Sequence, residues 1–352
     1  MRRSRCFPVP RWLGGGGGGQ RRTGVGETQC LAFVRPFLAV LSATWAACQA
    51  GVTLSAGPQD GQSVDGVADG DVLETDGRDE GPEEAEEEGG LCPVWVTSTA
   101  RGSLRDGSRE NPFAGLQEAL DERGECAHVI LAGEPDATPF SLAVDLEVRE
   151  HELLLLEGDP DAPNPPALVG VGEESGLRAW GTGVLVLMRL SLQNGRAGRG
   201  GCVDAEVGAL ELREVDFLGC HAVAAGGAVH VIASAVTVAN CTFTNNVSDE
   251  QGGGLALDGW TENITLEVVG TDFRSNSADE GGGMAILAPV LDSVVSDSMF
   301  VANSAGWRGS AISGYLGGQI IGNRFERNRG GAGGGALTGS AGWRGAEISR
   351  NV

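Results

Sequence analysis

Two acidic turns, one repeat apart, have residue types and spacing that could bind a metal ion. The stretch Asn246–Glu250 reads Asn-Val-Ser-Asp-Glu, and the stretch Asn276–Glu280 reads Asn-Ser-Ala-Asp-Glu. If these stretches lie on adjacent coils of a stacked structure, they are about 5 Å apart. Carboxylates are the hard oxygen ligands that Ca²⁺ prefers. We therefore expect a candidate calcium site, with a solvated turn as the alternative, at Asp249, Glu250, Asp279 and Glu280.

A repeated tripeptide suggests a second chemistry, the stacking of aromatic rings on sugars. Trp-Arg-Gly occurs at residues 307–309 and again at 343–345. A tryptophan exposed at a corner offers a flat apolar face with one polar edge. We expect four tryptophans near turns to be candidates for stacking on a polysaccharide, with packing into turns as the alternative: Trp180, Trp260, Trp307 and Trp343. The shared tripeptide indicates that Trp307 and Trp343 project in a similar way.

Catalytic arrangements are the third possibility among the charged residues. Enzymes that cleave polysaccharides use clustered carboxylates, with arginine or calcium to stabilise developing charge. The sequence has no lysine, its 4 histidines are scattered, and it contains no Gly-His-Gly. Four acids are close in sequence but have no basic partner at a fixed spacing: Asp204, Glu206, Glu211 and Asp216. We expect no catalysis, with a polysaccharide lyase, glycoside hydrolase or epimerase as the alternative.

Five cysteines follow residue 91, and an oxidising compartment would allow some of them to pair. Cys92 and Cys126 flank a predicted helix and are the best candidates for a disulfide. The other three are odd in number, and we expect buried thiols at Cys202, Cys220 and Cys241.

A repeat in the second half of the chain must position these residues. Its first mark is a glycine pair, with Arg-Gly in the fourth copy, ending at Gly227, Gly254, Gly283, Gly309 and Gly335. Its second mark is a phenylalanine, at Phe217, Phe243, Phe273, Phe300 and Phe325. Three residues after the last four of these stands an asparagine, at Asn246, Asn276, Asn303 and Asn328. A fixed period of about 25–30 residues predicts stacked identical units.

Each copy has the pattern of short strands and not of helices. The second residue after the glycine pair is apolar in every copy, and the third is apolar in some copies and polar in others. This alternation has the period of two that a strand with one buried face requires. We align the second residues as Val203, Val229, Ala256, Ala285, Ala311 and Leu337. This predicts an all-β fold, a right-handed parallel β-helix solenoid in which like residues stack in columns. The phenylalanines would form an internal column and the asparagines a ladder between coils, which Cys220 interrupts.

The interleaved motifs resemble the repeats of the polymorphic outer-membrane protein family, which are Gly-Gly-Ala-Ile and Phe-x-x-Asn. The best matches are Gly226–Val229 and Phe243–Asn246, and the resemblance covers roughly residues 200–352. It implies a surface-exposed passenger of the pectate-lyase-like β-helix superfamily with an adhesive role.

Residues 92–170 are expected to open the solenoid. Asn111 is a candidate N-cap with Pro112 in the first helical position, and Gly124 ends the helix. One face of this helix is apolar, at Phe113, Leu116 and Leu120. The segment looks like the start of many secreted pectate-lyase-like proteins, where a short amphipathic helix caps the first coil.

The N-terminal residues divide into two parts. Residues 1–50 are a low-complexity extension followed by a signal segment, because Arg35–Cys48 has an arginine, an apolar core and small residues before cysteine. The triplet ending at Cys48 resembles a lipobox, which makes Cys48 a candidate for lipidation; an ordinary cleaved signal is the alternative. Residues 51–91 are acidic and glycine-rich and are expected to be a disordered tether.

Residues 92–352 are expected to form the β-helix, with a C-terminus that is uncapped. The final residues match a stretch that elsewhere leads into a phenylalanine motif. A truncated, non-functional fragment is therefore a third interpretation.

The net charge of −23 argues against a nucleic-acid partner, which requires a basic surface. We expect a secreted or outer-surface protein with a structural, adhesive or glycan-binding role. Its partner would be a polysaccharide or the surface of a host or neighbouring cell. It would contact a membrane only through the N-terminal lipid anchor, and calcium is the one candidate cofactor.

Overall fold

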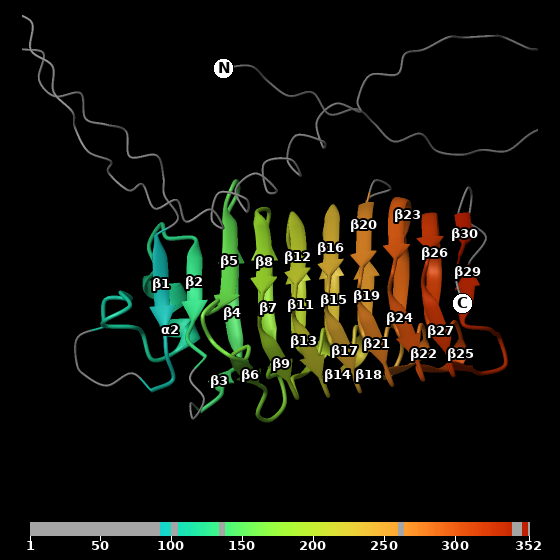
Figure 1. The fold of residues 1–352 in the computed structure, drawn as a ribbon, viewed down its shortest axis with the longest axis horizontal. Helices are drawn as coiled ribbons and strands as arrows, with labels where there is room; N and C mark the ends of the chain where they lie inside the picture. The colour runs from blue at the N-terminus through green and yellow to red at the C-terminus, as the bar shows by residue number, and fades with distance from the viewer. Residues whose placement is uncertain (1–91, 100–104, 134–137, 260–263, 340–346, 351–352) are drawn as a thin grey trace, which may run out of the picture. The chain divides into compact units, whose positions relative to one another are not determined.

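The computed structural model describes residues 92–99, 105–133, 138–259, 264–339 and 347–350. All of them lie in the larger of two compact units, Glu84–Val352. In this unit the described residues are almost entirely β and form a parallel β-solenoid, which confirms the predicted fold class (Figure 1). The predicted N-terminal segments 1–50 and 51–91, with Cys48, lie outside the described residues, and so do Trp260 and Trp343.

Three parallel sheets form the walls of the solenoid. Sheet two has eight strands, one per coil, and holds the phenylalanines: β3 Phe140–Ser141, β6 Ala167–Val169, β9 Ser191–Gln193, β13 Asp216–Leu218, β17 Thr242–Thr244, β21 Asp272–Arg274, β24 Met299–Val301 and β27 Arg324–Glu326. Sheet three has six: β10 Arg196–Arg199, β14 His221–Ala225, β18 Val247–Ser248, β22 Ser277–Glu280, β25 Ser304–Arg308 and β28 Arg329–Gly330.

Sheet one has sixteen strands, which lie in two rows. Two long strands run through both rows and so join them: β23 Met284–Ser296 and β26 Ile312–Ile321. The lower row in Figure 1 is β4 Val144–Val148, β7 Leu177–Gly181, β11 Val203–Glu206, β15 Val229–Ile232, β19 Leu255–Asp258 and, last, β29 Leu337–Gly339. The upper row is β1 Pro93–Val96, β2 His128–Leu131, β5 Leu153–Gly158, β8 Val184–Met188, β12 Ala209–Arg213, β16 Ala235–Ala239, β20 Ile264–Val269 and β30 Glu347–Ser349.

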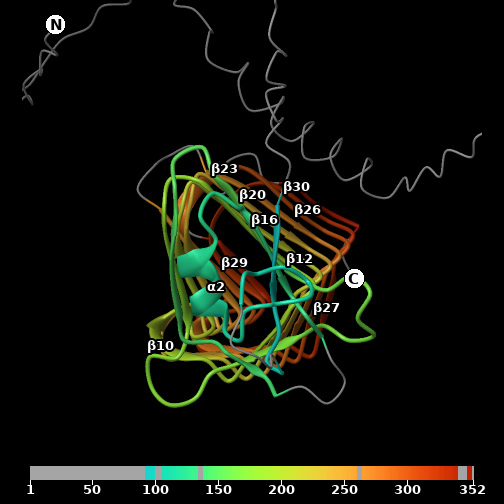
Figure 2. The same ribbon diagram turned by 90° about the vertical axis from the view of Figure 1, so that its left-hand side faces the viewer.

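The five phenylalanines stack in one internal column, as the repeat predicts. Sheet two pairs them in register, and neighbouring ring centroids lie 4.7, 4.7, 4.8 and 5.2 Å apart. The first four rings are fully buried, and Phe325 at the end of the column is partly buried. Seen from the N-terminal end, the coils superpose around this shared interior (Figure 2).

The asparagines form the predicted ladder at the corner between sheets two and three. The Oδ1 atom of Asn276 accepts hydrogen bonds from the backbone N and the Nδ2 of Asn246, at 3.0 and 3.1 Å. Asn276 in turn donates to Asn303 and to the carbonyl of Phe243. The backbone N of Cys220 donates to Asn246 at 2.9 Å, so the ladder reaches one coil further than expected.

The glycine register differs from the predicted alignment in three copies. Hydrogen bonding matches Gly227 to Gly253 and then to Gly282, so the inward residues after them are Leu255 and Met284. The alignment on Ala256 and Ala285 was therefore wrong by one residue, because three consecutive glycines concealed the register. The alignment on Ala311 was also wrong by one residue, because Met284 pairs with Ile312 and Gly309 takes the place of the first glycine of the pair, not the second. In each triplet the last glycine lies against a phenylalanine ring instead of making the corner.

The helix near the entry is shorter than predicted. It spans α2 Leu116–Glu122, with Gly115 at its N-cap position and no side-chain cap, so the prediction that Asn111 and Pro112 start it was wrong. The reason is that Phe113 is extended and pairs with β1. The side-chain amide of Gln117 bonds both the N and the O of Asp145 on β4, as a neighbouring strand would. A capping role for this helix stays a prediction.

A buried ion pair joins the end of this helix to the turn before β5. The side chains of Arg123 and Glu152 are 5% and 10% exposed and in contact. Burial pushes the pKa of the Glu152 carboxyl upward, but hydrogen bonds from Arg123 and from the backbone of Arg149, with attraction to both guanidinium groups, hold it below the ordinary 4.5. A carboxyl with a lowered folded-state pKa stabilises the fold above its unfolded pKa, and this contribution is lost as pH falls.

We therefore expect the free energy of unfolding to decrease as pH falls below about 4.5, partly through Glu152. Glu152→Gln, which does not titrate, should lose less stability over that range than the unmodified chain. Urea midpoints at neutral and acidic pH measure this, with the exposed neighbour Glu150→Gln as control. An equal loss in all three chains would contradict it.

Candidate functional site

Two outward-facing lines of side chains cross the lower row, one over its first four strands and the other over its first three. One line is Asp145, Arg178, Asp204 and His230, and the other is Glu147, Trp180 and Glu206; each is in backbone register from strand to strand. The residues between them, such as Leu146 and Ala179, are buried in the core. The alternation of the strands thus turns both lines outward. We call Glu147, Trp180 and Glu206 the Trp180 strip.

The first line is largely neutralised by its own members. The carboxylate of Asp204 accepts a hydrogen bond from Nδ1 of His230 at 2.7 Å. It also lies 3.6 Å from the guanidinium of Arg199. His230 is buried, and Arg178 stands in register between Asp145 and Asp204. Asp204 thus has basic partners that no fixed spacing in the sequence marks, because Arg199 precedes it in the same coil and His230 lies on the next coil.

The Trp180 strip has a different character. Trp180 is 47% exposed on the open face of the sheet, and Glu147 and Glu206 are exposed on the strands on either side of it. Among the described residues, neither glutamate takes part in an ion pair. An aromatic ring with hydrogen-bonding groups on two sides is suited to a sugar, which has apolar faces and polar edges.

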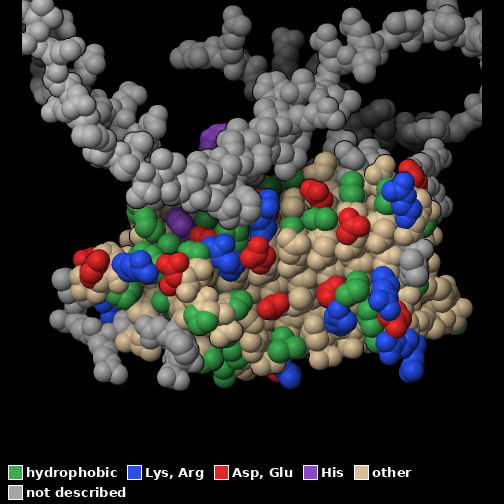
Figure 3. All heavy atoms as spheres, viewed as in Figure 1, with side chains coloured by type: hydrophobic (Ala, Val, Ile, Leu, Met, Phe, Trp, Pro, Cys, Tyr) green, Lys and Arg blue, Asp and Glu red, His purple; other side chains and the backbone are tan. Residues whose placement is uncertain are grey.

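The other described tryptophans have a ring face occupied by their own chain. Trp307 is 53% exposed, but the guanidinium of Arg308 lies 4.6 Å from its ring centroid, and Arg308 also pairs with Glu280. Figure 3 shows basic and acidic side chains gathered at this end of the solenoid. Trp95 borders a hollow of about 240 Å³, where Arg109 lies 4.7 Å from the ring. Sugar stacking at Trp307 remains a prediction, but Trp180 is the better placed ring.

The two acidic turns lie on adjacent coils, where the backbone N of Glu280 donates to the carbonyl of Glu250, but two of their carboxylates are bound by other side chains. Asp249 lies 3.2 Å from Nε2 of His221, and Glu280 is bound by Arg308 at 3.0 Å. Among the described residues, no group of three or more His, Cys, Asp or Glu side chains could hold a metal ion. Calcium binding by Asp249, Glu250, Asp279 and Glu280 stays an untested prediction.

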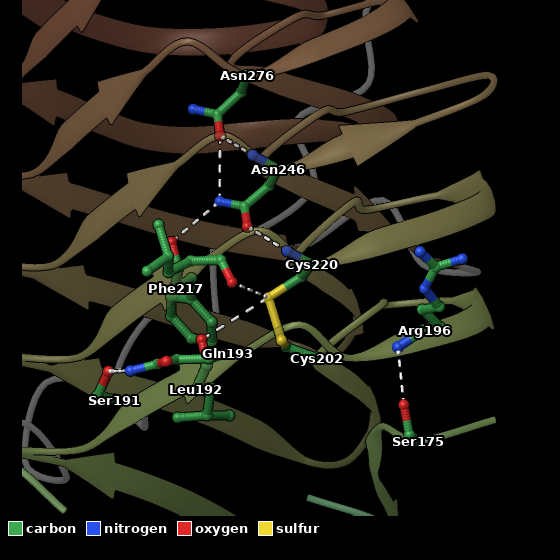
Figure 4. Close-up of a disulfide and its surroundings, with 11 residues drawn as sticks. Ser175, Ser191, Leu192, Gln193, Arg196, Cys202, Phe217, Cys220, Asn246 and Asn276 are labelled. Atoms are coloured by element: carbon green, nitrogen blue, oxygen red, sulfur yellow. Dashed lines mark hydrogen bonds between the residues drawn. A yellow bond between two sulfur atoms is a disulfide. The ribbon is translucent and has the colours of Figure 1, made fainter. Parts of the chain in front are cut away.

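Two disulfides brace the solenoid. Cys92 and Cys126 are joined, and so are Cys202 and Cys220, while Cys241 is a buried free thiol with a pKa raised to about 12 by burial. The expectation of free thiols at Cys202 and Cys220 was wrong. Cys220 takes the asparagine position, and Cys202 takes the small-residue position that faces it, occupied by Ala228 in the next coil. The bond therefore replaces the side-chain ladder in this coil (Figure 4).

A second polar cluster lies on the upper row. Glu157 contacts Nε2 of His128 at 2.7 Å and also pairs with Arg189, and Glu211 pairs with Arg213. Outside this cluster, on sheet two, Asp216 accepts a hydrogen bond from the hydroxyl of Thr242 at 2.5 Å. These carboxylates are engaged by their own neighbours, so they are poorer candidates for a ligand than the Trp180 strip.

No family model, curated protein or solved structure matches this chain. Within the part that the structure describes, no helix has the length and apolarity that crossing a membrane would require. The functional assignment therefore depends on the geometry of the site.

Proposed function

We propose that this chain is a secreted or surface-displayed β-solenoid that binds polysaccharide without cleaving it, through the Trp180 strip. The observation that carries the proposal is the exposed ring of Trp180, which is flanked in register by Glu147 and Glu206. A parallel sheet also presents a long, regular face, which suits an extended polymer better than a small molecule. An adhesive role on a host or neighbouring cell would follow from polysaccharide binding.

Replacing Trp180 with alanine should weaken polysaccharide binding about five- to thirtyfold. The ring supplies the apolar stacking surface, and loss of an exposed aromatic contact of about 1–2 kcal/mol corresponds to roughly this factor. A glycan array, followed by titration of the best glycan, measures the effect in the full chain. The matched control is Trp307→Ala, which removes another exposed tryptophan. Binding that depends on Trp307 and not on Trp180 would contradict the proposed site.

An extracytoplasmic location is supported by the two disulfides, because such bonds persist mainly in oxidising compartments. The signal segment expected before residue 48 agrees with this. Mass spectrometry of the chain from its native cells should recover the peptide pair linked through Cys202 and Cys220. Recovery of only the reduced peptides, with thiols trapped at lysis, would argue against export.

A glycoside hydrolase is the second candidate, favoured by the placement of two carboxylates on either side of one ring. Glu147 and Glu206 stand two strand spacings apart, or about 10 Å between backbones. Inverting glycosidases use carboxyl groups separated by roughly 6.5–9.5 Å. Release of reducing ends from the bound glycan, lost in Glu206→Gln, would favour this function over binding alone.

A further inference from the structure

The two outward lines of the lower row differ in their balance of charge. In the first line, Arg178 stands between Asp145 and Asp204, and Asp204 also meets Arg199 and His230. Positive and negative groups alternate there within the reach of long side chains on adjacent strands. This line therefore has little net charge to offer a ligand.

The Trp180 strip keeps its negative charge uncompensated. Glu147 and Glu206 are exposed and have no ion-pair partner among the described residues, and the residue between them is neutral. The next residue in register after Glu206 is Ile232, which adds no cation. A ligand that lies across the ring thus meets two carboxylates about one strand spacing, roughly 4.8 Å, to either side.

This combination fits a cationic group better than a neutral or anionic one. Ammonium groups are attracted to the face of tryptophan, and their hydrogen bonds to carboxylates are charge-assisted. A uronic acid would instead meet two like charges beside the ring. Acidic residues alone would not make a site; the exposed indole places an apolar surface where the pyranose ring of a sugar would lie.

Resting on the proposed function, we infer that the strip selects polysaccharides whose sugars carry a free, protonated amine, such as polymers of glucosamine. Trp180 stacks on the ring of the sugar, and Glu147 and Glu206 bind the ammonium groups of that sugar and of its neighbours. Removal of the amine's charge, for example by N-acetylation, removes the affinity that both carboxylates contribute to binding. Added salt weakens the interaction, because exposed charges are screened.

The test is a calorimetric titration of the full chain with three oligosaccharides of equal length, made of glucosamine, N-acetylglucosamine or galacturonic acid. It is run at low salt and at a pH where the amine is protonated. We expect the glucosamine oligomer to bind at least tenfold more tightly than the other two. The double variant Glu147→Gln/Glu206→Gln should reduce that preference to less than threefold. Its thermal unfolding should match the unmodified chain, because both side chains are exposed.

The outcomes separate this inference from the proposed function. Suppose that the N-acetylated or the acidic oligomer binds as tightly as the glucosamine oligomer, and that Trp180→Ala abolishes this binding. The strip then binds sugar, but the inference that it selects protonated amines is overturned. If no oligomer binds, or binding is unchanged in Trp180→Ala, both are overturned. A lysine-rich peptide that displaces the glucosamine oligomer at equal concentration would assign the strip to protein cations and also overturn the inference.

Discussion

Phe273→Ala is expected to lower the free energy of unfolding by about 3–5 kcal/mol, as large truncations of buried aromatic residues do. Phe273 is fully buried in the middle of the column, and its ring is stacked between those of Phe243 and Phe300 at 4.7 and 4.8 Å. The cavity cannot collapse easily, because the rings on either side belong to strands that are held in backbone register. Urea unfolding followed by circular dichroism measures the loss.

Phe325→Ala is the matched control, because it removes the same ring at the end of the column. Phe325 is only partly buried and has one stacked neighbour, at 5.2 Å. Its truncation should cost less than half as much as that of Phe273. If the two variants lost equal stability, the rings would not form a continuous internal column.

Asn276→Ala is expected to destabilise the chain by about 2–4 kcal/mol, because it leaves several buried groups without partners at about 1–3 kcal/mol each. The backbone N–H of Asn246 would lose its acceptor, and the carbonyl of Phe243 would lose its donor. Asn276→Asp keeps the side-chain acceptor but loses the donor and buries a charge. This variant should therefore not recover the stability that Asn276→Ala loses. The same unfolding experiment checks both.

Asn328→Ala provides the comparison for the ladder, because Asn328 is the partly buried last member. We expect its substitution to cost clearly less than that of Asn276. Should Asn276→Ala prove nearly neutral, the hydrogen-bond ladder would contribute little, and the phenylalanine column alone would hold the coils in register.

Spacing in the sequence was sufficient to predict the fold and its two internal columns. Phenylalanine and asparagine recur in a way that only stacked coils can use, since one coil alone cannot bury the ring or satisfy the amide. Where three glycines follow one another, as at 252–254, the pattern is degenerate, and only the hydrogen bonds show which glycine turns the corner.

The second disulfide was missed because Cys220 was recognised in the asparagine position, but Cys202 was not recognised in the position that faces it. Cys220 stands where other coils have asparagine, and Cys202 stands where they have alanine or glycine. Two such exceptions in one coil were a usable signal for pairing. The start of α2 was missed for a different reason: Phe113 pairs with a strand, and this tertiary contact outweighs the capping preference of Asn111.

Trp180 was a stacking candidate from the sequence, but its place between Glu147 and Glu206 was missed, because the repeat was aligned only from Gly200 onward. Extending the alignment one coil earlier would have placed Trp180 beside Glu206, and Arg178 beside Asp204. The partner on β4 was harder to find, because the first coils lack the glycine pair and the Phe-x-x-Asn spacing. Residues of one site therefore stood in separate segments with no shared motif.

The most direct measurement is a crystal structure of the chain with a bound glucosamine oligosaccharide. We predict a sugar ring stacked on the exposed face of Trp180, with its polar groups hydrogen-bonded to Glu147 and Glu206. A ring bound elsewhere on the solenoid, such as at Trp307, would contradict this. A Trp180 side chain packed against the protein in the free chain would contradict it equally.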